Sequence, residues 1–269
     1  MFSTSSITNE FEQEFKAYVN EQLSENTPLN EAMKYSLLSG GKRIRPQFAL
    51  EASRLVPLPK KAALTFAFTI EIIHAFSLVH DDLPCMDNDD FRRGIPTTHK
   101  KFGENQALLA GDALANFAYQ TFLSCLSEVS PESFKGAFQF FTDAVGGMIL
   151  GQSEELQVDN SNLNELLRIQ SLKTGLLFRA SILCPLLLSG VKNSDPLYID
   201  CNQYAEAFGF AFQIADDLED ETQDLNKNTK NILSHLGRAS AIELATLKLR
   251  SSKLSSQFSA TPQLLLKLK

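Results

Sequence analysis

Apolar residues recur along this chain at the spacing of helices rather than of strands. Phe11, Phe15 and Val19 lie four residues apart among charged residues, which predicts a helix over residues 8–23 with one apolar face. Further helices are predicted over residues 28–38, 61–79, 105–126, 130–156, 164–188 (interrupted near Pro185) and 195–220, and from Arg238 or Ser240 onward. Alternating strand patterns are nearly absent. The pattern predicts an all-α chain, and no break in composition divides it, so one large helical domain over residues 1–269 is expected.

Several residues mark where these helices begin and end. Gly40-Gly41 predicts the end of the second helix. Ser130-Pro131 and Asp195-Pro196 have the chemistry of an N-cap followed by a first-turn proline. The polar run ETQDLNKNTKN, residues 221–231, is expected to be a loop. The segment 61–79 is apolar on nearly all sides, as a central buried helix would be.

Composition narrows the class of protein. The chain has 269 residues, 43% of them hydrophobic, which is enough for a large core, and its net charge of −7 disfavours nucleic-acid binding. Four scattered cysteines without CxxC spacing favour a reducing compartment, the cytoplasm. The longest apolar stretch, residues 64–79, contains Glu71 and His74 and is short for a membrane span. No secretory signal is recognisable, and no membrane span is expected.

The stretch VHDDLPCMDNDDFRRG, residues 79–94, concentrates aspartates directly after an apolar helix. Asp81 and Asp87 are six residues apart, which one helix face does not bring together. Pro84 between them predicts a bend that returns Asp87 toward Asp81 and Asp82. A solvated loop is the alternative for this cluster taken alone.

A second acidic stretch, FQIADDLED, follows another apolar helix. Asp216 and Asp220 are one helical turn apart, about 40° around the axis, with Asp217 beside them and Gln213 four residues before Asp217. Carboxylates beside a buried helix are unfavourable unless they are paired or bind metal. If the two helices face each other, these acids converge, and divalent cations carrying a diphosphate would balance them. Mg²⁺ prefers such hard oxygen ligands.

Basic residues that could bind phosphate groups occur in GGKRIRP, in the arginine pair after the first acidic cluster, and in LKTG. These are Lys42, Arg43, Arg45, Arg92, Arg93 and Lys173. Each alone is an ordinary surface charge, but together they could hold a second, metal-free diphosphate. His74, inside the apolar helix, is either a core histidine or a phosphate ligand, and His80 is expected to be structural. No hydrolase, NTPase or dinucleotide motif is present.

In order along the chain, GGKRIRP, HAFSLVHDDLPCMDNDDFRRGIPTTHKKFGENQALLAGDAL, LKTG and FGFAFQIADDLED resemble the trans-isoprenyl diphosphate synthases. The chain looks most like the bacterial farnesyl type and next like the plastid geranylgeranyl type, from about Phe11 to Gly237. The resemblance implies an isoprenoid synthase-like fold with helices around a deep central cavity, usually in a homodimer. It also implies condensation of isopentenyl diphosphate with dimethylallyl and geranyl diphosphates to farnesyl diphosphate.

The same resemblance implies roles for single residues. About three Mg²⁺ ions, or Mn²⁺, would be bound by the two motifs: Asp81, Asp82, Asp87, Asp216, Asp217 and Asp220. Contacts to the allylic diphosphate fall to Arg92, Lys173, Thr174 and Gln213, of which Arg92 and Lys173 are expected to take part in catalysis. Contacts to isopentenyl diphosphate fall to Lys42, Arg45, His74 and Arg93, with Gly41 in support.

Chain length is expected to depend on Phe76 and Ser77, five and four residues before Asp81. An aromatic ring about 7.5 Å deeper along the helix could stop a growing chain at fifteen carbons. Ordinary core packing is the alternative role of Phe76. The family's lysine pair after the second motif has only Lys227 and Lys230 as candidates here. Geranylgeranyl or geranyl diphosphate synthesis, terpene cyclisation, and a non-catalytic binding subunit of the same fold are the competing functions.

Overall fold

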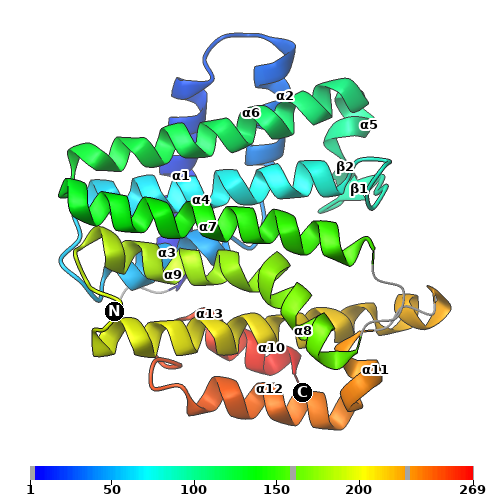
Figure 1. Cartoon of the computed structure of the whole chain (residues 1–269). Coiled ribbons are helices and arrows are strands. Elements are labelled where there is room, and N and C mark those ends of the chain that lie inside the picture. Colours follow the sequence, from blue (N-terminus) through cyan, green and yellow to red (C-terminus); the bar gives the residue numbers. More distant parts are fainter. Residues whose placement is uncertain (1–3, 158–161, 228–230, 269) are drawn as a thin grey trace. The chain divides into compact units, whose positions relative to one another are not determined.

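The computed structural model describes residues 4–157, 162–227 and 231–268, and the side chains of residues 8–157, 162–219 and 231–268 (Figure 1). The chain forms two compact units, Met1–Leu50 with Pro59–Val129 and Glu51–Leu58 with Ser130–Lys269. Each unit is described by itself. The single domain over the whole chain stays a prediction.

The first unit is built around α4, Lys60–Asp81, which packs along α6, Glu104–Leu123 (Figure 1). Its other elements are α1 Thr4–Gln22, α2 Pro28–Leu38, the start of α3 Ile44–Ser53, β1 Phe91–Arg92, β2 Ile95–Pro96, α5 Thr98–Phe102 and the 3₁₀ turn η1 Ser124–Ser127. The rings of Phe11, Phe15 and Phe68 lie within 5.8 Å of one another and join α1 to α4. Burying such side chains contributes about 2 kcal/mol each, which explains why α4 is apolar on nearly all sides.

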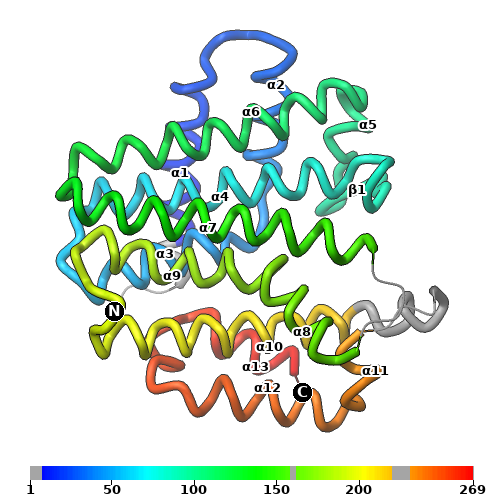
Figure 2. Tube along the Cα trace, viewed as in Figure 1, coloured from blue at the N-terminus to red at the C-terminus, as the bar shows by residue number. Residues whose placement is uncertain are grey.

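The second unit stacks long helices side by side, with α10 between α9 and α12 (Figure 2). Its elements are α7 Pro131–Glu155, α8 Leu163–Gln170, the π-helical turn η2 Ser171–Gly175, α9 Leu176–Leu188, α10 Pro196–Lys227, α11 Ile232–Leu236, α12 Arg238–Ser251 and α13 Ala260–Lys267. The stacked rings of Tyr204 and Phe258, 4.4 Å apart, hold the segment before α13 against α10.

The all-α prediction is confirmed, and so are the helix starts that rested on capping chemistry. Ser130 Oγ accepts a hydrogen bond from the Ser133 N–H at 3.1 Å, and α7 begins at Pro131. The helix expected after Asp195 begins at Pro196. The residues that the structure describes contain a single β-hairpin, β1–β2, with two residues in each strand.

Two expectations about helix continuity were wrong. The segment 221–231 was expected to be a loop, but α10 continues to Lys227, because ETQDLNK contains helix formers and neither glycine nor proline. The interruption expected near Pro185 is absent from α9, and the irregular turn is η2, ten or more residues earlier.

Among the residues that the structure describes, two helical segments are long and apolar enough to cross a membrane, Lys60–Asp81 and Leu163–Leu188. Within the fold, 67% and 56% of their most apolar windows are buried, as in the core helices of a folded domain.

Candidate active site

The end of α4 is followed by a tight turn that brings Asp87 back toward Asp81. The Asp87 N–H donates to the Asp81 carbonyl oxygen at 2.8 Å, and the Asn88 N–H donates to that of Leu83 at 3.1 Å. Asn88 holds a left-handed backbone, φ 55°. The bend predicted from Pro84 is therefore confirmed at the level of the backbone.

Asp82, on this turn, is buried and paired within the protein. Arg92 Nε donates to Asp82 Oδ1 at 2.6 Å, and Arg92 Nη2 lies 3.3 Å from Asp89 Oδ2. Burial raises the pKa of Asp82 above its ordinary value, and the hydrogen bond from Arg92 opposes that rise. Asp89, to which the sequence assigned no role, thus helps to hold Arg92. Asp90 pairs with Lys100 at 2.7 Å.

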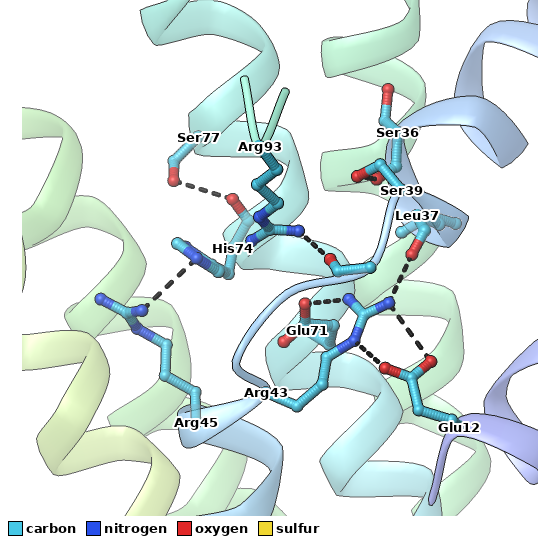
Figure 3. A network of polar contacts seen from close by, with 11 residues as sticks. Glu12, Ser36, Leu37, Ser39, Arg43, Arg45, Glu71, His74, Ser77 and Arg93 are labelled. Atoms are coloured by element: carbon cyan, nitrogen blue, oxygen red, sulfur yellow. Dashed lines mark hydrogen bonds and ion pairs between the residues drawn. The ribbon is translucent and has the colours of Figure 1, made fainter. Parts of the chain in front are cut away.

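Residues 40–45, which comprise the turn after α2 and the first two residues of α3 and which we call the basic loop, meet α4 at His74 (Figure 3). Arg45 Nη1 lies 3.4 Å from His74 Nε2. Arg93, at the tip of the β1–β2 hairpin, donates to the Gly40 carbonyl oxygen. Figure 3 shows Arg45 and Arg93 on either side of His74. Lys42 is exposed, on the same loop. The structure therefore brings together the residues expected to bind isopentenyl diphosphate.

This cluster is strongly positive. Desolvation lowers the pKa of His74 well below its ordinary value, and the guanidinium groups of Arg45, Arg93, Arg92 and Arg43 lower it further. His74 is consequently neutral at pH 7.

Close approach explains the glycine at position 41. A Cβ there would lie 2.6 Å from Arg93 Cζ, and the Gly41 φ of 139° is a conformation that other residues rarely adopt.

Arg43 behaves differently from its neighbours in the basic loop. It is 5% exposed, and it pairs with Glu12 and Glu71 instead of facing solvent. The sequence did not reveal these partners. Glu71 is a carboxylate inside an otherwise apolar helix, and that was the available sign that a buried cation lay opposite.

In the second unit, Asp217 is buried on α10 and both of its carboxylate oxygens are engaged. Gln213 Nε2 donates to Oδ1 at 3.0 Å, and the Ile232 N–H, at the start of α11, donates to Oδ2 at 3.1 Å. Asp216 is half-buried beside it. The side chains of Asp220 and Lys227, and the whole of Lys230, lie outside the described residues.

The predicted allylic contacts Lys173 and Thr174 lie on η2. Lys173 Nζ pairs with Glu155 at the end of α7, a partner that the sequence did not suggest. Thr174 is half-buried. A cavity of about 570 Å³ lies among α8, α9, α10 and α12, and Gln213 is one of its lining residues.

Phe76 packs its ring edge-on against His80, 5.1 Å between centroids, and Ser77 Oγ donates to the His74 carbonyl oxygen. His80 Nε2 lies 3.0 Å from the Leu108 carbonyl oxygen on α6. A Cβ on Gly111 would lie 2.1 Å from the His80 ring. His80 thus fills the contact between α4 and α6, as a structural residue would.

Magnesium fits the donor chemistry of the two motifs, since every predicted metal ligand in them is an aspartate and offers carboxylate oxygens. Among the described side chains, no three of histidine, cysteine, aspartate or glutamate lie close enough to hold one ion. Asp82 is paired with Arg92, and Asp217 with Gln213 and a backbone N–H.

Known proteins resemble this chain over most of its length. Residues 26–258 match the family model described as polyprenyl synthetase. A farnesyl diphosphate synthase from Haemophilus influenzae is 43% identical over 201 residues, 73% of this chain and 68% of that one. Large subunit 1 of a chloroplastic heterodimeric geranylgeranyl pyrophosphate synthase from Arabidopsis thaliana is 40% identical over 241 residues, 86% of this chain and 62% of that one.

The chain spans about three fifths of the length of the chloroplastic relatives that it matches. Among solved structures, an FPP/GFPP synthase from Zymomonas mobilis has a TM-score of 0.86 at 33% identity, covering 97% of this chain and 95% of that one.

Proposed function

Because this chain belongs to the polyprenyl synthetase family, we propose that it is a Mg²⁺-dependent trans-prenyltransferase that makes farnesyl diphosphate. Its substrates would be isopentenyl diphosphate and the allylic diphosphates with five and ten carbons. The observation that carries the proposal is the pair of cationic guanidinium groups, Arg45 and Arg93, on either side of the neutral His74. Three separate segments bring these groups together, and a bound diphosphate would relieve their mutual repulsion.

Within this proposal, the basic loop holds isopentenyl diphosphate. Arg45 and Arg93 bind diphosphate oxygens through their planar guanidinium groups, and Lys42 adds a point charge from the exposed side. His74, kept neutral, can donate one hydrogen bond without adding repulsion to the neighbouring arginines. The clamp positions the double bond of isopentenyl diphosphate for attack on the allylic carbon.

The allylic diphosphate is assigned to Arg92, Lys173, Thr174 and Gln213. The metal ligands are assigned to Asp81, Asp82, Asp87, Asp216, Asp217 and Asp220. Mg²⁺ at these carboxylates would neutralise the diphosphate and improve it as a leaving group. Arg92 would then shift from Asp82 toward the diphosphate, and Lys173 from Glu155, because both cations are at present held by carboxylates.

Two parts of the proposal concern the chain's surroundings. We assign the protein to the cytoplasm, where its four free cysteines would stay reduced. We assign it a homodimer, since α6 leaves Leu108, Leu109 and Leu123 each about half exposed, an apolar surface that a second subunit would cover.

Product analysis tests the proposal directly. The purified chain is incubated with Mg²⁺, dimethylallyl diphosphate and isopentenyl diphosphate, and the dephosphorylated products are separated by gas chromatography. A main product of fifteen carbons is expected. A twenty- or ten-carbon main product would favour the geranylgeranyl or geranyl alternative, and no prenyl product would favour a non-catalytic subunit.

An aspartate variant then tests the metal site. Asp81→Asn should lower kcat by roughly 10²-fold or more, because it removes charge from the proposed metal ligands. Asp143→Asn, which changes an exposed aspartate on α7, is the matched control and should leave turnover unchanged. Equal activities of the two variants would contradict the role of Asp81.

A further inference from the structure

One basic residue of the GGKRIRP run is buried within the protein. Lys42 is exposed and Arg45 reaches His74, but the Arg43 side chain points into the protein. Its backbone has φ 49°, a left-handed conformation that residues other than glycine rarely adopt. In this conformation the Arg43 side chain is buried, although Lys42 directly before it is exposed.

The Arg43 guanidinium joins three helices of the first unit (Figure 3). Nε donates to Glu12 Oε1 on α1 at 2.7 Å, Nη2 donates to the Leu37 carbonyl oxygen near the end of α2 at 3.0 Å, and Nη1 pairs with Glu71 on α4. Burial alone would lower the pKa of Arg43, but the two carboxylates raise it, so the group stays charged. The planar fork of arginine can serve all three acceptors at once, whereas lysine offers a single point charge.

The ion pairs of Arg43 with Glu12 and Glu71, which we call the anchor, affect the geometry of the neighbouring site. Glu71 lies three residues before His74 on α4, so the two side chains leave nearly the same face of that helix. Arg43 therefore fixes the basic loop to the helix that carries His74. The same loop places Arg45 against His74 and presents the Gly40 carbonyl oxygen to Arg93.

We infer that Arg43 is a positioning residue, held by Glu12 and Glu71, that shapes the basic loop for isopentenyl diphosphate without touching that substrate. This inference rests on the proposed function, because it concerns the same site.

Two variants separate positioning from direct contact. Arg43→Lys keeps the positive charge but loses the three-way fork. Glu12→Gln changes only the anchor, since a carboxylate cannot be a ligand of a diphosphate without a metal. If Arg43 is a positioning residue, both variants raise KM for isopentenyl diphosphate, by about tenfold for Arg43→Lys and several-fold for Glu12→Gln, while KM for the allylic substrate changes less than about twofold. Glu31→Gln, at a surface ion pair with Lys34 on α2, is the matched control and should change neither value.

Direct binding of isopentenyl diphosphate by titration calorimetry, with thermal unfolding of each variant, completes the test. If Glu12→Gln leaves isopentenyl diphosphate binding unchanged, or if Arg43→Lys weakens both substrates equally, the inference is overturned. Should Arg43→Lys fail to fold, Glu12→Gln decides alone, because Glu12 is partly exposed and its change is mild. A wild type that binds isopentenyl diphosphate without turnover would overturn the proposed function but leave the inference standing, provided that Glu12→Gln weakens the binding.

Discussion

At the scale of single residues, left-handed backbone gathers around the candidate site. In the part of the chain that the structure describes, the non-glycine residues with positive φ are Arg43, Asn88 and Arg93. Each costs about 1–2 kcal/mol relative to ordinary helical backbone, so each needs local contacts that hold it. Arg43 has its ion pairs, Arg93 the Gly40 carbonyl oxygen, and Asn88 a backbone hydrogen bond to Leu83.

Gly41 gives the first prediction at this scale. Alanine at position 41 would be strained at φ 139°, and its Cβ would push the Arg93 guanidinium away. We expect Gly41→Ala to lower the free energy of unfolding by about 1–2 kcal/mol. We also expect it to raise KM for isopentenyl diphosphate by about tenfold. Steady-state kinetics and chemical denaturation measure both. Gly136→Ala, on a helix with open space around it, should not raise KM; a rise there would show that the effect is unspecific.

His74 gives a prediction about pH. Its folded pKa is depressed, so the unfolded chain takes up a proton near pH 6.5 that the folded chain resists. The stability that His74 contributes is present above about pH 6.5 and is lost as the pH falls toward the folded pKa. The free energy of unfolding should therefore fall by up to ~1.4 kcal/mol per pH unit below pH 6.5.

Urea denaturation between pH 7.5 and 5.5 measures this slope. His74→Gln should flatten it, because glutamine does not titrate, whereas His235→Gln, at an exposed position, should keep the wild-type slope. Equal slopes in wild type and His74→Gln would show that His74 is not the group responsible.

At the scale of elements, local chemistry predicted where helices begin better than where they continue. An N-cap such as Ser130 bonds within the first turn of its helix, so the residues that determine the helix start are adjacent in the sequence. Pro185 does not break α9, because nearly all of this helix is buried. Burial contributes about 2 kcal/mol for each large apolar side chain, and the sum over the helix exceeds the ~3 kcal/mol cost of one proline. The π turn at 171–175 was missed since one extra residue barely alters an apolar periodicity.

The close approach of α7 to that π turn gives a prediction about Lys173 and Thr174. A Cβ on Gly151 would lie 2.5 Å from the Lys173 backbone nitrogen, and backbone cannot move aside as a side chain can. We expect Gly151→Ala to displace η2, to cost about 1–3 kcal/mol of stability and to raise KM for the allylic diphosphate. Gly146→Ala, on the same helix with nothing within 4 Å, is the matched control. If both variants bind the allylic substrate as the wild type does, η2 does not position Lys173 and Thr174 for it.

At the scale of the whole molecule, sequence reasoning named the chemistry but not the internal partners. The aspartates, the basic loop and His74 were identified by motif. The Glu12 and Glu71 partners of Arg43 were not, because they lie 31 and 28 residues away in the chain and only the folded unit brings them to it. A motif predicts which residues meet a ligand, whereas the residues that hold them in place follow from packing.

Product length is the part of the proposed function that Phe76 can test. Relatives that make fifteen- and twenty-carbon products are about equally similar, so family membership does not decide between them. Phe76 stands about 7.5 Å along α4 from Asp81 and is braced by His80. If its ring limits the growing chain, Phe76→Ala makes room for another isoprene unit. The main product should then shift from fifteen to twenty or more carbons, as measured by gas chromatography.

A control variant shows whether a change in product length comes from the position of the Phe76 ring or from the loss of packing in general. Phe138→Ala removes a half-buried ring from α7, where it stacks on Phe134, and should leave the product at fifteen carbons. Fifteen carbons from both variants would mean that another residue limits the chain and that Phe76 serves packing against His80. A twenty-carbon product from the wild type would mean that the ring at position 76 does not stop the chain, and the farnesyl assignment would fall with it.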